Sequence, residues 1–111
     1  MKTLKKINPD MHFRVLSALE EDPHLTQRAL SKKLGVSLGG VNYCLKELIK
    51  TGQIKLSNFE KNSNKLSYFY LLTPKGFRKK AILTSDFLKR KMIEYHNLKE
   101  ELDLIQSKLK L

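Results

Sequence analysis

The sequence contains a single cysteine, Cys44, which leaves no second thiol for an internal disulfide and no cysteine cluster for zinc. Its three histidines share no metal-ligand spacing, and no HExxH, GxSxG or GxxxxGK motif occurs. No grouping of acid, base and nucleophile is recognisable either. The sequence therefore predicts neither an enzyme nor a metal or cofactor site.

Long apolar runs are also missing. No stretch approaches the roughly 18 apolar residues of a membrane-spanning helix. The opening segment, MKTLKKI, lacks the apolar core of a signal peptide, so we expect a cytoplasmic protein with no membrane partner. With 111 residues and 41% apolar content, the chain can form one compact core, and no repeat or glycine-rich linker divides it.

Acidic residues are few relative to basic ones. The chain has 22 Lys and Arg against 11 Asp and Glu, a formal net charge of +11. Residues 1–80 hold 16 of the basic and 6 of the acidic side chains, whereas residues 81–111 hold 6 and 5. A cationic surface of this kind is most often maintained for nucleic acid. Solubility, or a lysine-rich genome, is the alternative explanation.

Capping signals predict two helices in the first third of the chain. Asn8 is a good N-cap and Pro9 suits a first helical position, so a helix begins here and ends at Asp22. Thr26 caps a second helix, flanked by leucines at the positions of a hydrophobic staple. Gly35 follows its apolar stripe where a left-handed residue ends helices at low cost.

A third helix follows almost at once. Only Val36 separates Gly35 from Ser37, the next N-cap, and the helix runs to Lys50 before Thr51-Gly52. This arrangement of helix, tight turn and capped helix predicts a helix-turn-helix. Helical spacing puts one set of residues on an apolar face (Leu38, Val41, Cys44, Leu45, Leu48 and Ile49) and another opposite it (Gly39, Asn42, Tyr43, Lys46 and Lys50).

A β-hairpin is predicted behind the third helix. Residues 53–59 read as a strand with Ile54, Leu56 and Phe59 half-buried, residues 60–65 as a polar turn, and residues 66–72 as an aromatic strand. Thr73 and Pro74 then begin a last helix. The predicted fold is mainly α with a small β-hairpin wing: a winged helix-turn-helix over 1–80 and a long C-terminal dimerisation helix over 81–111.

The last helix carries a heptad-like pattern. Positions 88, 91, 95, 98, 102, 105 and 109 are apolar or aromatic except for Lys91, and the helix could break at Thr84-Ser85-Asp86. A homodimer is the interpretation that fits best; folding back on the first helix, or docking in another protein, are alternatives. Phe13 can pack against this helix in the first two cases. The predicted dimerisation residues are Leu88, Tyr95, Leu98, Leu102, Ile105 and Leu109.

The third helix is the predicted reader of the DNA major groove, which admits one α-helix. Asn42 can contact adenine, Lys46 guanine, and Tyr43 a phosphate or a thymine methyl group. Two glycines at the helix start would allow a close approach to DNA, although they could also be merely tolerated there. The predicted DNA-backbone contacts are Arg28, Lys32, Ser37, Gly39, Gly40 and Lys50, with Lys61, Asn62, Asn64 and Lys65 at the wing tip. Cys44, on the apolar face, is expected to be a buried inert thiol rather than a redox sensor.

The segment 35–52, with its VNYCL stretch, resembles the helix-turn-helix of MarR-type regulators. Together with the LLTPKG stretch (71–76), it is more narrowly similar to a subgroup associated with exopolysaccharide (EPS) gene clusters. The resemblance runs from Pro9 to about Leu102. It implies a dimeric winged-helix transcription factor acting near polysaccharide biosynthesis genes. Typical MarR proteins have further helices at both ends and a phenolic-ligand cleft; this chain is shorter, so no small-molecule effector site is predicted.

The sequence therefore predicts a homodimeric, sequence-specific regulator whose partners are double-stranded DNA and a second copy of itself. Two other functions stay open. A protein-interaction adaptor would bind DNA only weakly, and an RNA-binding or architectural protein would show little preference among sequences.

Overall fold

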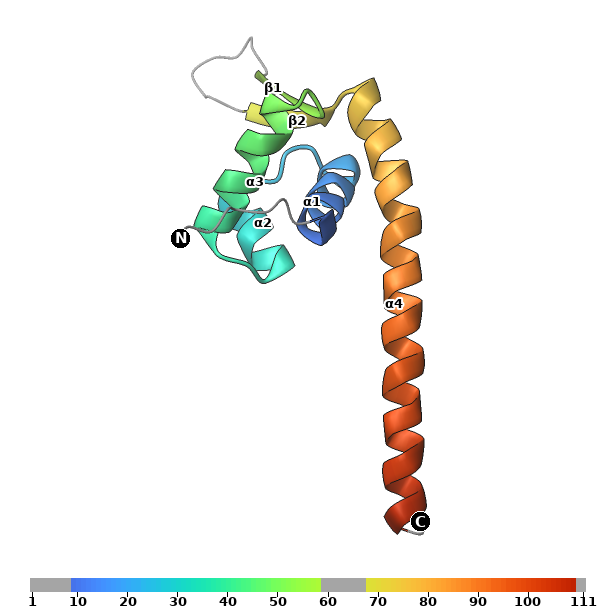
Figure 1. Cartoon of the computed structure of the whole chain (residues 1–111). Coiled ribbons are helices and arrows are strands. Elements are labelled where there is room, and N and C mark those ends of the chain that lie inside the picture. Colours follow the sequence, from blue (N-terminus) through green and yellow to red (C-terminus); the bar gives the residue numbers. More distant parts are fainter. Residues whose placement is uncertain (1–8, 59–67, 110–111) are drawn as a thin grey trace, which may run out of the picture.

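The structure is a computed structural model that describes residues 9–58 and 68–109. Three helices form a compact head: α1 (Pro9–Glu21), α2 (Gln27–Leu34) and α3 (Leu38–Lys50). Figure 1 shows them packed around one another, with the hairpin at one end and a long helix alongside. The head surrounds one core of leucines and small apolar side chains contributed by every element except β2.

The local signals that were predicted to begin and end α2 and α3 act as expected. The Thr26 hydroxyl accepts a hydrogen bond from the Ala29 amide at 3.0 Å. Gly35 ends α2 with φ +67°, a conformation that glycine adopts without strain. The Ser37 hydroxyl then caps α3 through the Gly40 amide, also at 3.0 Å. The predicted helix-turn-helix is therefore confirmed.

The hairpin consists of β1 (Ile54–Asn58) and β2 (Tyr68–Leu72), paired antiparallel with Ile54 opposite Leu72 and Leu56 opposite Tyr70. Ile54 is buried, as expected for a half-buried strand. Leu56 is 48% exposed, so its predicted burial is wrong. The hairpin extends beyond the head, so the core covers only the start of β1, which is the end nearer to α3. Phe59 lies outside the described residues.

The last helix, α4, runs without interruption from Pro74 to Leu109. Thr73 caps it by accepting from the Gly76 amide at 3.0 Å, with Pro74 at the first helical position as predicted. The predicted break at 84–86 is wrong. The Thr84 hydroxyl donates to the Lys80 carbonyl at 2.7 Å, one turn back, so this polar side chain is satisfied without leaving the helix.

The first half of α4 packs along α1. Leu83 joins the core, and the Phe87 ring stacks on the ring of Phe13 with centroids 4.6 Å apart. Ion pairs join Arg90 to Asp10, and Lys80 to Glu20. The predicted packing of Phe13 against this helix is confirmed, and folding back on α1 holds for this half of α4.

The second half of α4 extends away from the head (Figure 1). Every side chain from Met92 to Leu109 is exposed, and the described molecule reaches 66 Å along its longest axis. None of the described helices is apolar over a length that would span a bilayer. The fold is the predicted one: mainly helical, with a hairpin wing and a long C-terminal helix.

Candidate nucleic-acid interface

Helix α3 presents two contrasting sides. Val41, Leu45 and Leu48 are almost completely buried against α1 and α2. On the other side Tyr43 is 42% exposed, and Gly39, Lys46 and Lys50 are exposed with it. The buried side fixes the helix to the head, which leaves the tyrosine and the two lysines directed outward on a rigid support. This arrangement suits insertion of α3 into a groove of DNA.

The boundary of the apolar face differs from the prediction at two residues. Leu38 and Ile49 were placed on the buried face, but they are 40% and 41% exposed. Both lie at the edge of that face, where the neighbouring helix no longer covers them. Leu38 is therefore an exposed apolar side chain at the start of α3, which the sequence pattern alone assigned to the core.

Asn42 was predicted on the side opposite the apolar face, but it lies at this same edge and is half-buried. Its side-chain amide nitrogen donates to the Gln27 side-chain oxygen at 3.2 Å. Gln27 is the first residue of α2, and no part of the sequence pattern singled it out. The contact between two polar residues 15 positions apart follows from the packing of α2 on α3, which helical periodicity does not describe.

The two glycines at the start of α3 have different surroundings. The Gly40 amide donates to the Ser37 hydroxyl in the cap, so this amide is already partnered. A Cβ atom at Gly40 would lie 3.2 Å from the Ser37 hydroxyl oxygen, a tight contact. A Cβ atom at Gly39 would meet nothing within 4 Å. Gly39 is therefore the glycine with an open approach.

Further basic side chains border α3. Arg28 and Lys32 are exposed on α2, as is Lys33 beside them. Helix α2 contacts α3 directly. Lys33 lies on another side of α2, where it lines the groove between α1, α2 and α4. The predicted wing-tip contacts, Lys61, Asn62, Asn64 and Lys65, lie outside the described residues.

The titratable groups of the core are unsuited to chemistry. Burial, with a smaller effect from Glu47, raises the pKa of the Cys44 thiol to about 12, so the thiol stays protonated and unreactive. Burial lowers the pKa of His12, which keeps this side chain neutral in the core. Within the described ranges, no three His, Cys, Asp or Glu side chains come together as metal ligands do.

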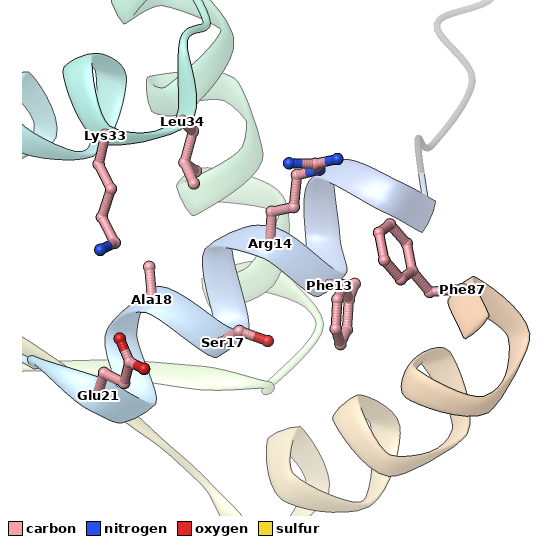
Figure 2. Close-up of a pocket in the computed structure, with 8 residues that line it drawn as sticks. All are labelled: Phe13, Arg14, Ser17, Ala18, Glu21, Lys33, Leu34 and Phe87. Atoms are coloured by element: carbon pink, nitrogen blue, oxygen red, sulfur yellow. The ribbon is translucent and has the colours of Figure 1, made fainter. Parts of the chain in front are cut away.

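A separate open groove of about 340 Å³ lies between α1, α2 and the middle of α4. Figure 2 shows the stacked rings of Phe13 and Phe87 at one end, and Lys33 and Glu21 at the other. The Arg14 guanidinium lies 5.5 Å from the centroid of the Phe87 ring. The groove takes no residue from α3 and is therefore distinct from the candidate interface.

Comparisons with known proteins agree with this geometry. Residues 10–55 match the family model for winged helix-turn-helix DNA-binding domains. No curated protein gives a significant match to the chain. Among solved structures, the chain is similar to a MarR/EmrR family transcriptional regulator from Acinetobacter sp. ADP1, with a TM-score of 0.66 and 18% identity over 89% of this chain and 71% of that one.

Two further structures show the same fold. The adhesin competence repressor AdcR from Streptococcus pyogenes has a TM-score of 0.63 and 17% identity, over 91% of this chain and 76% of that one. ZitR from Lactococcus lactis, solved in complex with DNA, has a TM-score of 0.61 and 22% identity, over 98% and 75%.

Helices α2 and α3 with the hairpin thus form a winged helix-turn-helix, and residues 10–55 match a family of DNA-binding domains with this fold. Over nearly the whole chain, the fold is that of MarR-family transcription regulators. The family model matched by residues 10–55 describes a DNA-binding domain and not an enzyme. The resemblance to MarR-type proteins that the sequence indicated is therefore confirmed for the fold.

Proposed function

We propose that this chain is a MarR-type regulator that binds double-stranded DNA sequence-specifically as a homodimer. The observation that carries the proposal is the exposed, basic side of α3, held on a fully buried opposite side. In this assignment Asn42, Tyr43 and Lys46 read base edges. Leu38 is added to them, because its exposed methyl groups suit the methyl group of thymine.

Contacts to the DNA backbone are assigned to residues around α3. Arg28, Lys32 and Lys50 are exposed cations and suit phosphates. Gly39 allows close approach of the helix start, and the wing-tip residues remain part of the proposal. Ser37 and Gly40 act through the cap that orients α3. Residues 1–80 are assigned to DNA binding and residues 81–111 to dimerisation.

A second copy of this chain is the proposed partner of α4. The six predicted dimerisation residues are each between 52% and 59% exposed, although they are apolar or aromatic. Together with Lys91 they recur at alternating intervals of three and four along α4, the spacing of a coiled-coil seam. The one basic residue at a seam position, Lys91, is directed elsewhere: its ammonium group lies 5.3 Å from the centroid of the Phe87 ring and contacts Glu94.

Charges beside the seam favour a parallel pair. With Tyr95 and Leu102 at heptad position a, Glu94 occupies position g and Lys99 position e. These positions meet between the two helices of a parallel coiled coil, so each glutamate would face the partner's lysine. Within one chain the same groups make only exposed pairs, to Lys91 and to Asp103, which contribute little. A parallel pair also puts both heads at one end, as a two-fold symmetric operator requires.

The target genes and location complete the proposal. The resemblance of the VNYCL and LLTPKG stretches to the EPS-associated subgroup supports exopolysaccharide biosynthesis genes as targets. A cytoplasmic location follows from this function. No small-molecule effector is assigned.

Footprinting on pooled fragments of the source genome, at near-physiological salt, tests the function. We expect a protected two-fold symmetric site with half-sites roughly one helical turn apart. Binding that spreads evenly over all fragments and disappears with added salt would contradict the proposal and favour the architectural or adaptor function.

Variants then test the reading side on the site obtained. Lys46→Ala is expected to weaken operator binding and to relax the preference at one position, by about 1–3 kcal/mol. Lys89→Ala, at an exposed lysine of α4 outside the proposed seam, is the matched control and should leave binding unchanged. Equal effects of the two variants would mean that only overall charge matters.

A further inference from the structure

A chain of side-chain hydrogen bonds crosses the head beside the exposed side of α3. The Asn42 amide nitrogen donates to the Gln27 oxygen at 3.2 Å, and the Gln27 amide nitrogen donates to the Tyr70 hydroxyl at 3.4 Å. The three residues come from α3, α2 and β2, and each is half-buried. This series of hydrogen bonds therefore connects α3, which is the proposed reading helix, with α2 and with strand β2 of the wing.

The far end of this chain is itself fixed. The Tyr70 amide donates to the Pro23 carbonyl at 3.0 Å, which attaches β2 to the turn before α2. Gln27 follows this turn directly, with Thr26 as its helix cap. Tyr70, which accepts from the Gln27 side chain, is thus held by its own backbone against the turn from which Gln27 starts.

The chemistry of the Asn42 amide leaves room for a base. A primary amide has two N–H donors and one oxygen acceptor. A bidentate contact to adenine uses one donor, to N7, and the acceptor, from N6. The contact with Gln27 needs one N–H donor, which leaves the second donor and the acceptor for a base. The bond to Gln27 therefore leaves the donor and the acceptor that adenine requires. It also fixes the orientation of the Asn42 amide, because a half-turn of this amide would place its oxygen against the Gln27 oxygen.

We propose that Gln27 is a positioning residue for base recognition, which holds the Asn42 amide in the orientation that reads adenine. Tyr70 holds Gln27 in turn, so the wing strand supports the specificity of α3. This inference rests on the proposed function, since it requires Asn42 to read a base. An amide that is already ordered loses less side-chain freedom on binding, a benefit of roughly three- to tenfold in affinity.

The experiment uses the full-length protein and a panel of operator duplexes in which each base pair is changed in turn. Asn42→Ala should abolish the preference at one base pair. Gln27→Ala should reduce operator affinity about three- to tenfold and weaken the preference at that same base pair. Affinity for unrelated DNA and the salt dependence should stay unchanged, because no phosphate contact is lost.

Two further variants isolate the hydrogen bonds. In the Asn42→Ala background, Gln27→Ala should have no additional effect on the preference, since the two act as a unit. Tyr70→Phe removes one hydroxyl and should give a smaller loss at the same base pair, with the fold verified by circular dichroism. Asn97→Ala, at an exposed amide residue of α4 outside the proposed seam, is the control and should bind like the wild type.

Opposite outcomes identify which idea fails. If Asn42→Ala changes the preference but Gln27→Ala and Tyr70→Phe do not, the positioning role is overturned while the proposed reading side stands. If Gln27→Ala weakens all sequences alike, Gln27 contacts phosphate and positions nothing. If Asn42→Ala leaves every preference intact, the assignment of the reading residue and the inference built on it are both wrong.

Discussion

Replacing Leu102 by aspartate tests the proposed seam most directly. Leu102 is 52% exposed in the single chain. Full burial of a leucine side chain contributes about 1.5–3 kcal/mol, so covering the exposed half contributes about 1 kcal/mol per copy and about 2 kcal/mol per dimer. Burying polar carboxyl groups in the seam costs roughly another 2 kcal/mol or more. Leu102→Asp should therefore weaken dimerisation at least about a thousandfold.

Sedimentation equilibrium over a range of protein concentrations measures this change, and circular dichroism verifies that α4 stays helical. Leu104→Asp is the matched control. Leu104 is 58% exposed and only two positions away, but it lies outside the heptad seam. The same substitution there should leave the dimer intact. A mass unchanged by Leu102→Asp, or equal dissociation of both variants, would refute the seam.

Three other changes test separate parts of the structure. Glu94→Lys should weaken a parallel dimer about tenfold, because it removes the two attractive pairs between Glu94 of one chain and Lys99 of the other. Adding Lys99→Glu to the same chain should restore the dimer affinity, which sedimentation measures. An antiparallel pair would show no such rescue. Gly76→Ala should destabilise the protein by about 1–3 kcal/mol in urea unfolding, because the added Cβ would lie 2.0 Å from a backbone oxygen. Gly39→Ala has open space around it and should instead stabilise the protein by up to about 1 kcal/mol. Similar effects of the two substitutions would contradict the close packing of Gly76. Cys44 should resist iodoacetamide at pH 8.5 in the native protein and react in urea, because its pKa is raised to about 12; rapid labelling of the native thiol would show that it is accessible.

The fold was predictable where the signals are local. Thr26, Gly35 and Ser37 each act through a hydrogen bond or a dihedral angle within a few residues of their own position. Such signals can be read from one segment of chain without knowing what packs on it. The same holds for Thr73 and Pro74 at the start of α4.

The errors fall where the outcome depends on distant segments. Periodicity placed Leu38 and Ile49 toward the core, but the core is not wide enough to cover the edge of α3. The predicted break in α4 overlooked the bond of Thr84 to the preceding turn. Gln27 was missed altogether, because its contacts lie 15 and 43 residues away in sequence.

The continuity of α4 gives the two proposed interfaces a fixed relation. The side of α4 that includes Leu83 and Phe87 packs on α1, whereas Leu88 and Tyr95 lie on a neighbouring side of the same helix. Each residue of a helix advances by about 100°, so an uninterrupted helix sets the angle between these two sides. Dimerisation along the second side would then orient both heads without a flexible linker. The dimer should therefore accept only a narrow range of distances between the two half-sites, since α4 continues without a break through Thr84 and Ser85.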